Sequence, residues 1–293
     1  MKKHSLNNLI ENLKQLGLKQ GDTVLIRGDV GKIGRTENKI SEDILNAFFQ
    51  VIGEEGTIIT LTFTEQFLLP LIDKNYVFAK KTPSKSGAFA RIILNFPDSL
   101  RSSHPTSSFA AIGKNAEYLL NGHDEKAHAY LPIQKLIEVN GKMLIVGCID
   151  NSPGFTTVHL AQENLGLSSK TFLKNLVGVY YEKNGQKKLY KRNSIGGCSM
   201  GFSNFYEEYK NQNKLISGVF GNAESFLINA KDAYQVEYDL LKVNPKFALC
   251  NDPYCKSCRG IWFYNMKEMP AFYIRILKKV LLNILNKDKS CNK

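Results

Sequence analysis

A strand–helix–strand pattern in the first 65 residues restricts the fold more than any other feature of this sequence. Residues 23–26 (TVLI) form a short apolar run after a Gly-Asp turn, and residues 57–63 (TIITLTF) are rich in β-branched side chains. Between them, residues 42–52 place large apolar side chains on one face of a helix. Two neighbouring strands that are joined by a helix run parallel. The pattern therefore predicts an α/β fold with a parallel pair of strands.

The rest of the chain adds helices and strands to this pattern. Residues 5–18 space leucine and isoleucine as on one face of a helix that Ser5 caps, and residues 142–148 (KMLIVGC) form a core strand. Beyond residue 171 the pattern becomes β, with a hairpin that turns near Asn184-Gly185. No internal repeat or low-complexity linker is present, so composition alone places no domain boundary.

The net charge of the chain restricts the classes of partner that it is expected to bind. A net charge of +12 favours phosphorylated ligands, nucleic acid or acidic membrane, although much of it fits an ordinary lysine-rich surface. The basic and aromatic residues are not interleaved as in RNA-binding modules, so we expect no nucleic-acid partner. No apolar run follows Met1-Lys2-Lys3-His4, and no stretch approaches the roughly 20 apolar residues of a membrane-spanning helix. A cytoplasmic protein is therefore expected.

A hydroxyl-rich elbow at residues 101–111 (RSSHPTSSFAA) is the first candidate site. Pro105 disfavours helical geometry at His104, and the run then returns to apolar residues at Phe109. A polar loop that enters a buried element is a common way to present side chains to a ligand. An ordinary hydroxyl-rich turn has the same local composition, so the elbow alone does not decide between the two.

Two loops that follow predicted strands hold further candidates. Residues 27–35 (RGDVGKIGR) combine glycines with basic residues, including Lys32, as a phosphate-contacting loop does, but a plain strand–helix connection fits equally well. Residues 151–154 lead into a helix that carries His159. In α/β folds, ligands gather beyond the carboxyl ends of strands, which makes His159 a candidate catalytic group.

A group of cysteines near the end of the chain has the spacing of metal ligands. Cys250, Cys255 and Cys258 are separated by four and two intervening residues, and thiolates so placed reach one tetrahedral ion. Cys198 is the leading candidate for the fourth ligand. We expect a structural zinc site. An iron–sulfur centre, or reduced thiols without a ligand, are the alternatives.

The last long segment predicts a basic helix with one apolar face. Residues 269–289 repeat leucine and isoleucine at helical spacing, with lysines around them. Such a helix packs on its own domain or on a second subunit, which would make a homodimer. Peripheral contact with an anionic membrane surface is the alternative.

Several segments, in order, resemble the aminoglycoside 3-N-acetyltransferase family, also called the antibiotic acetyltransferase family. They cover roughly residues 5–165, and the most specific are RSSHPTSSFAAIGKNA at 101–116 and TTVHLAQE at 156–163. The resemblance implies an α/β fold with a mixed sheet flanked by helices, distinct from the GNAT acetyltransferase fold, and here with a cysteine-containing C-terminal extension. It also implies transfer of an acetyl or other acyl group from acyl-CoA to an amine.

The family resemblance also implies roles for individual residues. His159 matches the family's catalytic histidine and would act as general base in a ternary complex. Residues of the elbow would line the acyl-CoA and catalytic cleft, and two basic residues would bind the CoA phosphates. The elbow residues are His104, Thr106, Ser107 and Ser108, and the phosphate-binding residues are Lys32 and Arg101.

Two departures from the family pattern bear on mechanism and acceptor. The acidic residue expected three positions after His159 is Gln162 here. The nearest acid, Glu163, lies about 100° further round the helix and is a candidate catalytic residue together with His159 and His104. The loop that usually reads His-x-Ser-Leu is Arg27-Gly28-Asp29-Val30 in this chain. We expect residues 1–245 to form the acyltransferase domain and residues 246–293 to form a segment packed on it.

The basic charge favours a small-molecule amine acceptor that is itself anionic. We expect the amine of a nucleotide-linked amino sugar in surface polysaccharide synthesis. An aminoglycoside acceptor is one alternative, and a non-catalytic zinc-containing module that binds an anionic surface is the other.

Overall fold

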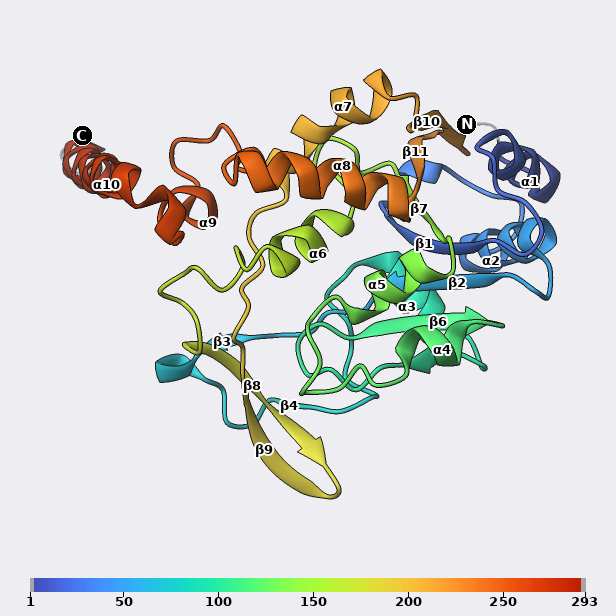
Figure 1. Cartoon of the computed structure of the whole chain (residues 1–293), viewed down its shortest axis with the longest axis horizontal. Helices are drawn as coiled ribbons and strands as arrows, with labels where there is room; N and C mark the ends of the chain where they lie inside the picture. Colours follow the sequence, from blue (N-terminus) through green and yellow to red (C-terminus); the bar gives the residue numbers. More distant parts are fainter. Residues whose placement is uncertain (1–2, 291–293) are drawn as a thin grey trace.

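A seven-stranded mixed sheet forms the centre of residues 3–290, the part of the chain that the computed structural model describes (Figure 1). The strand order is β10-β11-β7-β1-β2-β6-β5. The three central strands run parallel, and the flanking strands are antiparallel to their neighbours. The bounds are β1 Thr23–Gly28, β2 Thr57–Leu61, β5 Leu100–Arg101, β6 Phe109–Gly113, β7 Lys142–Val146, β10 Ile216–Phe220 and β11 Ala223–Asn229. The predicted parallel pair and the α/β class are confirmed.

Helices cover both faces of this sheet because the central strands are apolar on both sides. Within β1, Leu25 belongs to one core cluster, whereas Val24 and Ile26 belong to the other. One face packs against α1 Leu6–Gln15, α2 Ile40–Ile52 and α3 Ala88–Leu94. The other packs against α4 Ala116–Leu120, α5 Leu131–Glu138, α6 Thr157–Asn164, α7 Phe205–Asn211 and α8 Ala230–Val243. The expected cap of the first helix is confirmed, because the Ser5 hydroxyl accepts from the backbone N–H of Asn8 at 3.2 Å.

A second, small sheet lies beside the main one. It contains β3 Phe67–Leu68, β4 Val77–Phe78, β8 Val177–Lys183 and β9 Gln186–Lys191, with the short helix η2 Leu69–Leu71 between β3 and β4. The predicted hairpin turns at Asn184 and Gly185, both in the left-handed region with φ of 55° and 71°. Both β3 and β4 pair with β8, β3 antiparallel and β4 parallel.

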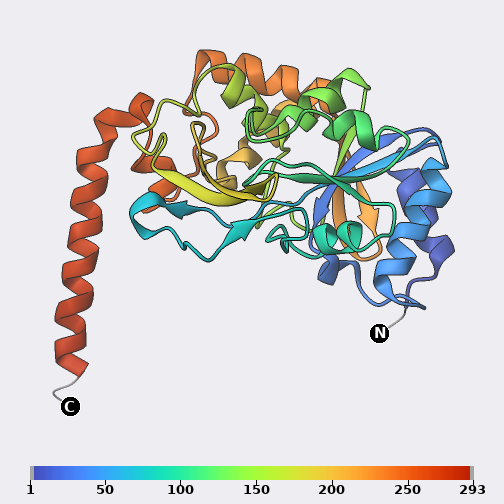
Figure 2. The same ribbon diagram turned by 90° about the horizontal axis from the view of Figure 1, so that it is seen from below.

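The C-terminal segment begins on the protein body and ends away from it. It contains α9 Lys256–Arg259, η4 Phe263–Glu268 and α10 Met269–Ser290. Phe272 is buried at the start of α10, but Leu277 and its neighbours are exposed and the helix projects from the body (Figure 2). Residues 246–293 were predicted to pack on the acyltransferase domain. In the single chain, most of α10 does not do so. In the described part of the chain, no helix has the length and apolar character to cross a membrane.

Candidate active site

Three parallel strands end at one edge of the sheet, and a cavity of about 620 Å³ opens there. Its walls come from the loops after β1, β2 and β7 and from the turn before α3. This is the position at which ligands bind in open α/β sheets. The lining residues include Arg27, Asp29, Thr60, Phe63, Lys85, Cys148, Asn151 and Ser152.

Arg27 in this cavity holds the loop that precedes the catalytic helix. Its guanidinium donates to the Ser152 hydroxyl at 2.9 Å, to the Ser152 carbonyl at 2.7 Å and to the carbonyls of Pro153 and Gly154. Burial lowers the pKa of Arg27 from its ordinary value. Arg27 therefore fixes the entry to α6 from the position where the family usually has a histidine.

His159, in the first turns of α6, is linked to this cavity through aromatic rings. Its ring stacks on Tyr130 at 5.1 Å between centroids and meets the edge of Phe202 at 4.9 Å. Tyr130 in turn contacts Phe63, which lines the cavity. Aromatic contacts on two sides fix the orientation of the imidazole.

The hydrogen bond that His159 makes sets its tautomer. Its Nδ1 lies 3.1 Å from Oε1 of Gln162, an oxygen that can only accept, so Nδ1 carries the proton and Nε2 keeps its lone pair. Burial lowers the pKa of His159 to about 4, and the bond to Gln162 opposes this only in part. At neutral pH the ring is an uncharged base.

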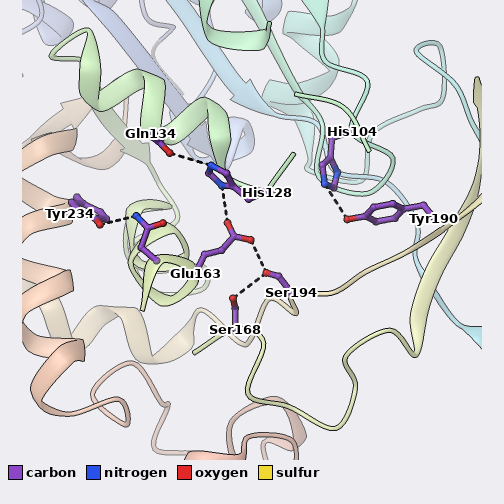
Figure 3. Close-up of polar contacts among 9 residues, drawn as sticks. His104, His128, Gln134, Glu163, Ser168, Tyr190, Ser194 and Tyr234 are labelled. Atoms are coloured by element: carbon purple, nitrogen blue, oxygen red, sulfur yellow. Dashed lines mark hydrogen bonds and ion pairs between the residues drawn. The ribbon is translucent and has the colours of Figure 1, made fainter. Parts of the chain in front are cut away.

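Glu163 points to a different partner. Its carboxylate lies 3.1 Å from Nδ1 of His128 and accepts at 2.8 Å from the hydroxyl of Ser194 (Figure 3). Burial would raise the pKa of Glu163, but these two bonds together keep it below its ordinary value. The expected catalytic role of Glu163 beside His159 is therefore not supported, because the extra residue turns its side chain to another face of the helix.

His104 is held inside the elbow as a neutral ring. Its Nδ1 accepts from the backbone N–H of Ser107 at 3.0 Å, and its Nε2 lies 3.3 Å from the hydroxyl of Tyr190 (Figure 3). It also stacks on His123 at 4.8 Å. Burial, followed by the neighbouring His123, holds the pKa of His104 well below its ordinary value. His104 therefore shapes the elbow and shares no wall of the cavity.

The hydroxyls of the elbow bond within the protein. Ser108 donates to the carbonyl of Thr62 at 2.8 Å, and Thr106 and Ser107 are buried with their hydroxyls 3.3 Å apart. None of the three lines the cavity. We expected the elbow and His159 to line one pocket, and this cavity does not contain both. Aromatic contacts nevertheless connect them through Phe63, which touches Phe109 of the elbow and Tyr130 beside His159.

The two basic residues expected at the CoA phosphates differ in exposure. Arg101 is buried and donates to the carbonyls of Thr62, Lys80 and Thr82, which corrects the expectation that it binds a phosphate. Lys32 is exposed in η1 Val30–Ile33, beside Gly147 at the end of β7. Its role at the CoA phosphates stays a prediction.

The four predicted metal-binding cysteines meet at one point. The sulfur atoms lie within 4.8 Å of one another, although Cys198 is more than fifty positions from the other three. We refer to Cys198, Cys250, Cys255 and Cys258 as the four-cysteine cluster.

Sequence analysis did not identify Tyr130 and Phe202, the rings that hold His159. Both stand in segments without a motif. Phe202 comes from η3 Met200–Asn204, beyond the region in which the sequence resembles the family. Only a three-dimensional arrangement brings them to the imidazole.

The fold and the cleft are those of an N-acetyltransferase. Residues 25–242 match the family model for aminoglycoside 3-N-acetyltransferase, so the chain belongs to that family and is an N-acetyltransferase. Aminoglycoside N(3)-acetyltransferase III of a Salmonella species is 24% identical over 262 residues, 78% of this chain and 88% of the relative. The non-catalytic alternative is thereby set aside.

Solved structures support the same fold. AAC-IIIb, solved as a binary complex with CoASH, has a TM-score of 0.71 at 21% identity, over 83% of this chain and 97% of its own. AAC-VIa bound to sisomicin has a TM-score of 0.70 at 21% identity, over 83% and 98%. The predicted mixed sheet flanked by helices is confirmed.

Proposed function

We propose that this protein transfers the acetyl group of acetyl-CoA to an amine of an aminoglycoside-type amino sugar, with His159 as general base. The observation that carries the proposal is the neutral imidazole of His159, which is held through Nδ1 by Gln162 and is linked by the ring of Tyr130 to Phe63 in the cavity wall. The acceptor nitrogen attacks the thioester as a free amine, having lost its ammonium proton to solvent, and a positioned neutral imidazole accepts the second proton as the carbon–nitrogen bond forms.

The reaction needs no covalent enzyme intermediate. The Nε2 atom of His159 takes a proton from the acceptor nitrogen as that nitrogen attacks the thioester carbon. The carbon–sulfur bond then breaks, the CoA sulfur leaves with the electron pair, and the proton returns to it through the imidazolium. Tyr130 and Phe202 hold the ring plane throughout, and Gln162 holds the Nδ1 proton in place.

The acceptor class is supported by the comparisons rather than by the total charge. The relatives are aminoglycoside acetyltransferases, and AAC-VIa binds sisomicin, whereas the nucleotide-linked sugar was inferred from the charge of +12 alone. In the cavity, Asp29 is the acidic lining residue, and Lys85 is paired with Glu65. The carboxylate of Asp29 supplies one partner for an ammonium group of such an acceptor.

A panel of acceptors tests the proposal. Thiol release from acetyl-CoA is followed with sisomicin, gentamicin, simple amino sugars and nucleotide-linked amino sugars. We expect turnover with the aminoglycoside-type compounds and a loss of about 100-fold or more in kcat for His159→Ala, without a change in fold. Turnover with the nucleotide-linked sugars alone would replace the proposed acceptor, and full activity of His159→Ala would remove His159 from the mechanism.

A further inference from the structure

The four-cysteine cluster lies outside the acetyl-transfer chemistry, yet it is joined to the active site. Cys198 stands four residues before Phe202, and Phe202 packs its ring edge on His159. The other three cysteines belong to the segment that leads to α10. The cluster therefore connects the C-terminal segment to the part of the chain that supports the base.

The geometry of the cluster suits one tetrahedral ion. A zinc ion bound by four thiolates at about 2.3 Å holds its sulfur atoms about 3.8 Å apart. The four sulfur atoms already lie within 4.8 Å of one another, so shifts of about 1 Å or less complete the site. Backbone N–H groups also point at two of them: that of Met200 to Cys198 at 3.3 Å and that of Cys250 to Cys258 at 3.4 Å. Such bonds favour the thiolate form that a metal requires.

The apolar core around the cluster is small. Its buried members are Ile195, Leu249, Cys250, Cys258 and Trp262, with a ring of partly buried hydrophobic residues around them. A core of this size does not order a segment by apolar burial alone, and small units of this kind depend on a metal or a disulfide. Trp262 and Arg259 close the outside, because their side chains donate to the carbonyls of Ser257 and Cys250.

We propose that the four-cysteine cluster binds one structural zinc ion, and that this ion holds Phe202 in place against His159. On binding, the four thiols release their protons to solvent and the ion is held as a thiolate complex of net charge −2. Phe202 then acts as a positioning residue.

The segment between Cys198 and Phe202 is closely packed. Gly201 has no space for a side chain, because a Cβ there would lie 2.4 Å from the carbonyl oxygen of Ala248. Gly154 is equally close to Phe202, with 2.1 Å between an added Cβ and the Cβ of Phe202.

Metal content is the first test, and it does not depend on acetyl transfer. The full chain, purified under reducing conditions without added metal, is expected to contain one zinc per chain. Cys255→Ser should hold less than about a tenth of that amount. Cys291→Ser, which changes the cysteine of the C-terminal tail, is the matched control and should keep one zinc. Replacement of zinc by Co²⁺ should give the visible absorption bands of tetrahedral cobalt bound to thiolates.

The link to His159 needs a readout that general loss of stability would not move. Removal of zinc with a chelator should lower kcat and should raise the pKa of the His159 ring by about one unit, as water reaches it. NMR titration of the imidazole measures this directly. Phe202→Leu should produce the same shift with zinc still bound, and removal of zinc from that variant should add little.

Three results would overturn the proposal. The first is wild-type protein without stoichiometric zinc that also fails to bind Co²⁺. The second is an iron–sulfur spectrum or a disulfide among these cysteines in the freshly purified protein. The third, which overturns the link alone, is a zinc-depleted protein in which kcat and the titration of His159 are both unchanged. Because zinc content is measured separately, a wrong acceptor would not be mistaken for a missing metal.

Discussion

Gln162→Glu is expected to raise the pKa of His159, to increase kcat above neutral pH and to move the acid limb of the pH–rate profile to higher pH. In the wild-type protein the Nδ1 proton of His159 faces a neutral amide oxygen at 3.1 Å, in surroundings that lower the pKa of the ring to about 4. A carboxylate at the same place would face the imidazolium with a full opposite charge. Such a partner raises the pKa of a neighbouring base by about 1–3 units.

The expected size of the effect follows from that shift. A rise of 1–3 units corresponds to about 1.4–4 kcal/mol of stabilisation of the imidazolium. If about half of the proton charge has moved in the transition state, kcat at pH 8 should rise by about 3- to 30-fold. The unprotonated ring is the active form, so activity increases as pH rises through its pKa. The acid limb of the profile should therefore move from about pH 4 to between about 5 and 7.

The assay is kcat for thiol release from acetyl-CoA, measured between pH 5 and 9. Gln134→Glu makes the same chemical change at an exposed position beside His128 and should leave the profile as in the wild type. An acid limb that stays in place in Gln162→Glu would refute the reasoning. A rate gain at pH 5 as large as the gain at pH 8 would also refute it, because a base of higher pKa is more protonated at pH 5.

Three stability predictions complete the set. The pKa values of His123 and His159 are about 3 and about 4, below the value of about 6.5 that a histidine has in the unfolded chain. Because the unfolded chain binds protons first as pH falls, the free energy of unfolding should decrease by on the order of 5 kcal/mol between about pH 6.5 and pH 4. A decrease in Tm over this range measures the effect. Arg101→Ala should cost about 3 kcal/mol or more in urea unfolding, since it leaves buried carbonyls without a donor, whereas the exposed Arg91→Ala should cost under about 0.5 kcal/mol. Gly201→Ala should lower the free energy of unfolding by about 1–3 kcal/mol, because its new methyl group would meet backbone atoms. A urea midpoint equal to that of the wild type in Arg101→Ala or in Gly201→Ala would contradict the prediction for that variant.

Local periodicity was sufficient for the central elements of the fold. The strands β1 and β2 and the helix between them follow from apolar spacing, and their parallel pairing follows from the connection. The strands β3 and β4 could not be found in this way, because their partner β8 lies about a hundred residues further along the chain. The polar sequence of helix α7 also hides its inner face, because Tyr209 is fully buried against Phe155 and Phe205.

Sequence reasoning located the chemical groups of the site better than their contacts. His159 was predicted from a motif and the four-cysteine cluster from spacing, and the structure brings the four sulfur atoms within 4.8 Å of one another. Arg101 was assigned to a phosphate because of its charge, but charge does not tell whether a guanidinium meets a ligand or its own backbone. Tyr130 and Phe202 carry no local signal, since their contact with His159 exists only in the folded chain.

The cavity at the sheet edge takes its walls from loops that are independent of one another in sequence. A substitution in any one of them changes a single wall and leaves the pairing of the strands below untouched. The shape of this cavity can therefore change loop by loop without any change in the sheet that carries it.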